Sequence, residues 1–214
     1  MFSQYQINLA VLADAEPTSA LRLWLERGLE QAGAAIGVRV QAHWLGGESL
    51  GRALEQSPLA YDGVCCAASA VDAEPVRAVI AAARRQGVPF LGIAQGFYLA
   101  LEDILASLPA RLSEHVAVRG LAAQLSAEVA PVISRKAWPN LLELREVGAT
   151  RLRRYGLSVA PVGRVHAFEL ADHPFFIASA VQPDPSHPVP PLLAGLVGAC
   201  AVQRLHEAQM QVAV

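Results

Sequence analysis

Residues 88–100 are VPFLGIAQGFYLA, a short apolar run that passes directly into a helix-forming segment. Small residues stand at alternating positions in it, namely Gly92, Ala94 and Gly96. This pattern predicts a buried strand that turns sharply into a helix, because only small side chains let the two elements approach closely. We therefore expect a nucleophile elbow, with Ala94 at its strained tip and a helix N-terminus behind it that stabilises an anion.

Strand and helix patterns alternate around this elbow. Short apolar runs predict strands at Gln6–Ala13, Val38–Leu45, Asp62–Ala68 and Pro89–Ile93. Helical patterns cover Pro17–Ala35, Glu74–Gln86 and Phe97–Leu108, and Gly37 and Gly87 are expected to stop the first two. The alternation predicts βαβ units, and hence a three-layer α/β fold with a mostly parallel central sheet.

The second half of the chain has weaker patterns. Residues 109–140 hold helix-like apolar patches without clear strand signals. Shorter strands, in part antiparallel, are predicted at Val159–Val162, Arg164–Leu170 and Phe175–Val181, and a last helix at Leu192–Gln209. Because no linker interrupts the pattern, residues 1–214 are predicted to form a single domain.

Composition restricts the classes of function. Of the 214 residues 53% are hydrophobic and 17% are charged, and the formal net charge is −2. This balance provides no basic surface for nucleic acid or for an anionic membrane. Three cysteines cannot form a secreted disulfide framework, and no long apolar run is present. We expect a cytoplasmic protein without a cofactor or a metal site.

The elbow resembles the Pro-Phe-Leu-Gly-Ile-Cys-x-Gly sequence of the glutaminase domain of CTP synthase, a class I glutamine amidotransferase. The run ELADHPFFIA, residues 169–178, is similar to the Glu-x-x-x-His-Pro-Phe-Phe-x-Ala run of the same family. The resemblance covers nearly the whole chain, loosely over residues 109–149, and is strongest to stand-alone CTP-synthase-like proteins. It implies a flavodoxin-like fold with a cleft where the elbow meets residues 179–184.

The same resemblance implies that the catalytic groups are replaced. The nucleophilic cysteine becomes Ala94, and the His-Pro-Glu motif becomes Gln182, Pro183 and Asp184. Glutamine cannot accept a proton at useful pH, so the general base is lost although a carboxylate remains. Glutamine hydrolysis by the family mechanism is therefore not expected.

The neighbouring positions differ as well. The glycine-rich oxyanion loop becomes Ala67-Ala-Ser-Ala70, which lacks the backbone freedom of glycine. Tyr98 and Asp103 replace a glutamine and a substrate-binding glutamate, and Tyr98 is expected to occupy the vacated glutamine site. The candidate ligand-binding residues are Ala68, Ser69, Ala94, Gln95, Tyr98, Asp103, Ser179, Gln182, Asp184 and His187.

Two classes of function stay open. In the first, the chain is a catalytically inactive amidotransferase-like protein that binds a small metabolite or a partner protein, such as a synthase or a second copy. In the second, it is an enzyme with different chemistry on a small amide or acid. The residues available for that chemistry are Asp184, Asp103, His187, Tyr98 and Cys66.

Other reactive side chains have ordinary structural interpretations. Cys65 and Cys66 are expected to be buried in a strand, and Cys200 in the last helix. His173 is expected to order the His-Pro-Phe-Phe turn rather than to bind a metal.

Overall fold

The structure, a computed structural model, describes residues 5–13, 19–46, 60–67, 73–107, 116–120, 140–144, 157–159, 163–164, 167–170, 172–179 and 191–212. Its helices are α1 (Ala20–Ile36), α3 (Ala73–Gln86), α4 (Gln95–Ser107) and α7 (Pro191–Val212). Its first four strands are β1 (Gln6–Leu12), β2 (Arg39–Leu45), β3 (Gly63–Cys66) and β4 (Phe90–Ile93). The later strands are β5 (Val116–Gly120), β6 (Asn140–Leu144), β7 (Leu157–Val159), β8 (Gly163–Arg164), β9 (Ala167–Leu170) and β10 (Phe176–Ser179).

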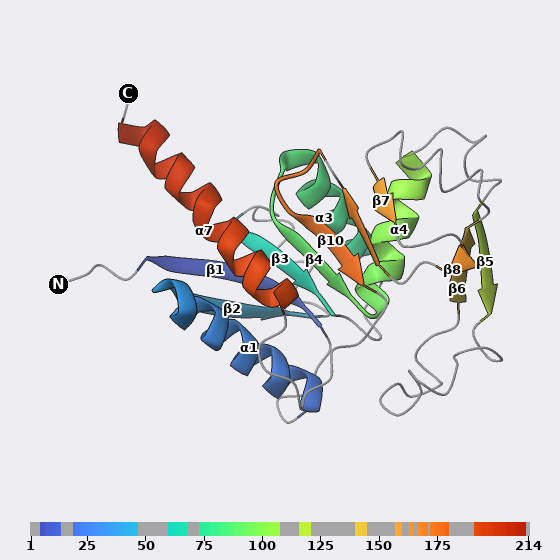
Figure 1. Cartoon of the computed structure of the whole chain (residues 1–214), viewed down its shortest axis with the longest axis horizontal. Coiled ribbons are helices and arrows are strands. Elements are labelled where there is room, and N and C mark those ends of the chain that lie inside the picture. The colour runs from blue at the N-terminus through green and yellow to red at the C-terminus, as the bar shows by residue number, and fades with distance from the viewer. Residues whose placement is uncertain are drawn as a thin grey trace.

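The main sheet has seven strands in the order β2-β1-β3-β4-β10-β9-β7. The first five are parallel to one another, whereas β9 and β7 continue the sheet in antiparallel pairing. Helices α1 and α7 pack together on one face, and α3 and α4 pack together on the other (Figure 1). The predicted three-layer α/β fold with a mostly parallel sheet is confirmed.

The helix ends in the first half have local causes. The Ser19 side chain accepts a hydrogen bond from the backbone N–H of Arg22 at 3.2 Å, so α1 begins at Ala20 and not at Pro17 as expected. Gly37 and Gly87 follow α1 and α3 with φ of 72° and 71°, a backbone conformation that suits glycine. Both predicted stops are confirmed. Helix α4 starts at Gln95, two residues earlier than predicted.

The second half differs from the sequence-based expectation. Strands β5, β6 and β8 form a separate antiparallel sheet, and β5 lies within residues 109–140, where the sequence shows helix-like patches and no clear strand signal. The predicted strand Arg164–Leu170 is divided between β8 in this sheet and β9 in the main one. These strands are only two to five residues long. So few residues do not show whether the apolar pattern is that of a strand or a helix, and hydrogen bonding to distant strands decides the structure instead.

Aromatic side chains fill the core around the elbow strand. The rings of Phe90 and Phe176, on neighbouring strands, stack with centroids 4.5 Å apart. Phe97 of α4 packs against Phe168 of β9 at 5.4 Å. All four side chains are at most 2% exposed. This packing holds α4 against β4, β10 and β9, and so positions the turn between β4 and α4.

Candidate functional site

The turn between β4 and α4 has the geometry of a nucleophile elbow. Ala94, at its tip, has φ of +61° and is the only non-glycine residue with positive φ in the described part of the chain. That backbone conformation is unfavourable for an L-residue by about 1–2 kcal/mol. Its N–H donates to the carbonyl oxygen of Ser179 at 3.0 Å, and its own carbonyl accepts from Phe97 N–H at 3.1 Å. The predicted strain at the tip is thus present and is held by two backbone hydrogen bonds.

The small residues beside the tip are required by close backbone contacts. A Cβ atom added to Gly92 would lie 2.9 Å from the carbonyl oxygen of Gly96. A Cβ atom added to Gly96 would overlap the carbonyl oxygen of Cys66, the last residue of β3. Helix α4 therefore starts directly against two strands, as the alternation of small residues predicts.

Part of the candidate ligand-binding set meets at this carboxyl-terminal edge of the sheet. Ala94, Gln95 and Ser179 lie together there, since Ser179 ends β10 beside the elbow and Gln95 opens α4. Gln95 is half-buried and Ser179 is buried. Five further candidates lie outside the described residues, namely Ala68, Ser69, Gln182, Asp184 and His187.

Tyr98 lies one helical turn after the elbow tip and belongs to the core. It is 7% exposed, and its ring meets that of Phe97 edge-on with centroids 5.1 Å apart. Burial raises the pKa of the phenol to about 12. Tyr98 therefore stays protonated at neutral pH, which suits a hydrogen-bond donor and not a general base.

Asp103 lies farther along α4 and faces helix α3. Its carboxylate accepts a hydrogen bond from Arg84 Nε at 2.7 Å, and both side chains are mostly buried. The acid proposed for ligand binding is thus engaged in an ion pair between two helices. Arg84 could not be predicted from the sequence, because its partner is set by helix packing and not by any local motif.

The three thiols are buried, as expected. Cys65, Cys66 and Cys200 are each 0% exposed. Burial raises the pKa of the Cys65 and Cys200 thiols well above the usual range, so both stay protonated at neutral pH. Among the described residues no group of three or more His, Cys, Asp and Glu side chains is arranged to hold a metal ion. No helix in the described part of the chain has the length and apolar character needed to cross a membrane.

His173 orders its turn, as the sequence analysis predicts. Its Nε2 lies 3.1 Å from the carbonyl oxygen of Ala83, and its Nδ1 accepts from Phe175 N–H at 3.2 Å. These two contacts require the neutral ring with its proton on Nε2. Burial lowers the pKa of His173, and the nearby Arg84 guanidinium adds to that effect. The ring thus fastens the loop before β10 to the end of α3.

His173 is expected to make stability depend on pH. Because its pKa is lower in the folded than in the unfolded chain, its stabilising contribution is complete above the unfolded value of about 6.5. That contribution is lost as the pH falls through the folded-state pKa. Thermal unfolding between pH 8 and pH 5 should therefore show a weaker pH dependence in His173→Gln than in the wild type. His206→Gln, at an exposed position of α7, is the matched control. An equal pH dependence in wild type and His173→Gln would contradict this role.

Comparison with known proteins relates the chain to CTP synthase. No family model matches the sequence. The chain is 27% identical over 247 aligned residues to CTP synthase of Methanopyrus kandleri, covering 92% of the chain and 46% of that enzyme. The chain thus spans about half the length of this curated relative.

Two solved structures are similar to this chain, and the first of them shows the fold. The glutaminase domain of Trypanosoma brucei CTPS with bound acivicin matches with a TM-score of 0.61 and 16% identity, covering 91% of this chain and 94% of that one. A glutamine amidotransferase from Thermotoga maritima matches with a TM-score of 0.47 and 11% identity, over 92% and 97% of the two chains.

The fold, with its elbow after β4, is that of class I glutamine amidotransferase domains. Its sequence is similar to that of CTP synthase, and its fold is similar to that of a CTP synthase glutaminase domain.

Proposed function

We propose that this chain is a catalytically inactive amidotransferase-like protein that binds a small metabolite or a partner protein. One observation carries the proposal: the elbow tip is present in its strained conformation, with φ of +61°, but the residue there is Ala94. Glutamine hydrolysis in this class requires a thiolate at that position, which attacks the amide carbon and forms a covalent intermediate. A methyl group has no electron pair to donate, so that step cannot occur.

The surrounding groups support the same conclusion. Cys66, the nearest thiol along the sheet, is fully buried, and Tyr98 stays protonated at neutral pH. At the position of the family's histidine base the sequence has Gln182, which cannot take up a proton. An enzyme with different chemistry would need other acid–base groups at this edge. Since Asp103 is paired with Arg84, no described contact favours that alternative.

The retained architecture supports a binding role. Ala94, Gln95 and Ser179 keep the carboxyl-terminal edge of the sheet in the arrangement that open α/β folds use for ligands. Because the relative found by sequence is a whole CTP synthase, a synthase is the first partner protein to test.

The purified protein is expected to release no ammonia from glutamine and to resist labelling by a glutamine-mimicking diazo-ketone. Both results follow from the missing nucleophile and from thiols that solvent cannot reach. Ammonia release is measured with a coupled assay, and labelling by intact-protein mass spectrometry. Turnover, or covalent labelling of any cysteine, would refute the proposal and favour the enzymatic alternative.

The Ala94→Cys variant separates the loss of the nucleophile from the loss of the base. A cysteine should be tolerated there, because the backbone already accommodates a Cβ atom at φ of +61°. We expect this variant still to release no ammonia, because Gln182 cannot activate the thiol. Turnover in the single variant would show that the base is dispensable. Thermal unfolding with amino acids, nucleotides and organic acids then identifies the class of ligand, since a ligand that binds the native state raises Tm.

A further inference from the structure

A second polar centre lies at the edge of the sheet opposite the elbow. Tyr61 and Asp62 immediately precede β3, and Val88 lies two residues before β4, whereas Ala94 follows β4. The C-terminal half of α7 covers this amino-terminal edge with Arg204 and Glu207. Together these residues line a cavity of about 250 Å³, which we call the amino-edge pocket.

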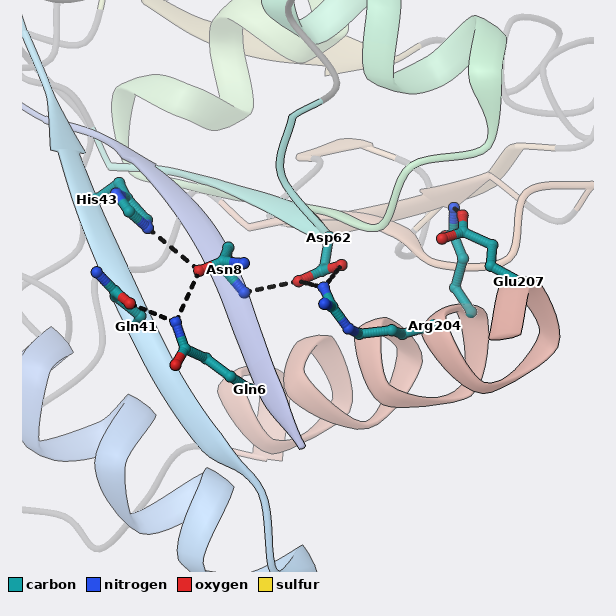
Figure 2. A network of polar contacts seen from close by, with 8 residues as sticks. Gln6, Asn8, Gln41, His43, Asp62, Arg204 and Glu207 are labelled. Atoms are coloured by element: carbon teal, nitrogen blue, oxygen red, sulfur yellow. Dashed lines mark hydrogen bonds and ion pairs between the residues drawn. The ribbon is translucent and has the colours of Figure 1, made fainter. Parts of the chain in front are cut away.

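Asp62 anchors the amino-edge pocket. Its side chain is 12% exposed, and one oxygen accepts from Asn8 N–H at 2.6 Å. Arg204 Nη1 donates to both carboxylate oxygens at 2.7 and 2.8 Å (Figure 2). The Asp62 N–H in turn donates to the Asn8 carbonyl at 2.8 Å. The carboxylate is therefore held by two elements, and it fixes the guanidinium of Arg204 in place.

Polar side chains of the two neighbouring strands extend this arrangement. Gln6 donates to the Asn8 side-chain oxygen at 3.2 Å and also bonds to Gln41, and His43 Nε2 lies 3.4 Å from the same Asn8 oxygen (Figure 2). The His43 ring packs against Tyr61, which lines the pocket, with centroids 5.3 Å apart. One wall of the pocket is thus backed by an ordered network, and its groups are positioned before any ligand arrives.

The opposite charges of Arg204 and Glu207 in the pocket do not form an ion pair with each other. Arg204 uses one nitrogen for Asp62, and its Nε and Nη2 have no protein partner among the described residues. Glu207 lies three residues farther along the same helix, where an ion pair with Arg204 is sterically possible. Its carboxylate instead has one long contact, 3.4 Å from Gln203 Nε2. Among the described residues, the pocket therefore presents unpaired N–H donors of Arg204 beside a Glu207 carboxylate that has only one long hydrogen bond.

We propose that the amino-edge pocket binds a small zwitterion of the free α-amino acid class. The free nitrogens of Arg204 bind the carboxylate of the ligand, and the carboxylate of Glu207 binds its ammonium group. A short aliphatic side chain then packs against Val88 and Ala60, which supply apolar surface to the same cavity. The volume suits a molecule of that size, because pockets for larger, drug-sized ligands begin at about 300 Å³. This site is separate from the elbow, so a test of amino acid binding here does not depend on the proposed function of the elbow.

Calorimetric titration of the full chain with L-valine, L-alanine and glycine tests the proposal. We expect saturable binding of at least one of them in the millimolar range or tighter, with the aliphatic side chain adding affinity. Two analogues of valine each lack one charge and are called half-ligands here. Isobutylamine lacks the carboxylate, and 3-methylbutanoate lacks the ammonium group. Each is expected to bind at least about tenfold more weakly than L-valine, since each loses one charge-assisted contact. Absence of binding by all three amino acids, or a half-ligand that binds as tightly as L-valine, overturns the proposal.

Three variants locate the binding. Glu207→Gln removes the acceptor for the ammonium group at an exposed position and should weaken L-valine binding about tenfold or more. Arg204→Lys keeps a positive charge next to Asp62 but removes the planar nitrogen fork, and should weaken binding similarly. Glu30→Gln, on exposed α1 surface, is the control with unchanged binding. Binding that is unchanged in both Glu207→Gln and Arg204→Lys would place the ligand elsewhere and refute the site.

Discussion

Gly96→Ala is expected to be among the most destabilising single substitutions in the chain, lowering the free energy of unfolding by at least about 3 kcal/mol. The added Cβ atom would overlap the carbonyl oxygen of Cys66 and lie 2.9 Å from its carbonyl carbon. Because both atoms belong to the backbone of a buried central strand, the contact cannot be relieved by rotating a side chain. Helix α4 would have to move away from β3, and the packing of Phe97 would be lost with it.

Urea unfolding followed by circular dichroism measures this loss, and Gly198→Ala is its matched control. Gly198 is also a helical glycine, in α7, but a Cβ atom there would meet no atom within 4 Å. The control should gain up to about 1 kcal/mol, because alanine favours a helix more than glycine does. If Gly96→Ala were as stable as Gly198→Ala, the close contact between α4 and β3 would not exist as described.

Phe90→Ala is expected to lower the free energy of unfolding by about 3–5 kcal/mol. The Phe90 ring is fully buried and stacks on Phe176, and it lies against Gly92 on the strand that leads into the elbow. Its removal leaves a cavity where β4 and β10 meet, the pair of strands that also holds Ala94 through Ser179. The loss should therefore affect the elbow as well as the global stability.

The same urea titration measures the stability of Phe90→Ala, with two other variants for comparison. Phe90→Leu keeps most of the apolar volume and should cost clearly less than Phe90→Ala. Leu23→Ala, at a side chain that is 55% exposed, should change the stability by less than about 0.5 kcal/mol. A Phe90→Ala variant no less stable than Leu23→Ala would contradict the central place of this ring in the core.

Much of the first half of the fold could be predicted from local patterns. Strands β1 to β4 and helix α3 lie within two residues of the predicted ranges. They could be predicted because a buried parallel strand needs a continuous apolar run and a helix ends readily at a glycine with positive φ. Both requirements are satisfied by residues that are close together in the sequence. The strands of the second half are short, and their pairing depends on partners far away in the chain.

In the candidate site, too, some features follow from the sequence and others only from the tertiary structure. That the elbow tip carries no nucleophile follows from the residue type alone, because a methyl side chain has no reactive atom whatever surrounds it. The strained turn is equally local, since small residues on both sides of Ala94 allow strand and helix to meet. The tertiary structure alone brought Asp103 to Arg84, and Asp62 to Arg204, which lies 142 residues away. Ion-pair partners depend on which elements pack side by side, and no spacing along the chain specifies that. The amino-edge pocket became visible for this reason only once α7 was placed against β3.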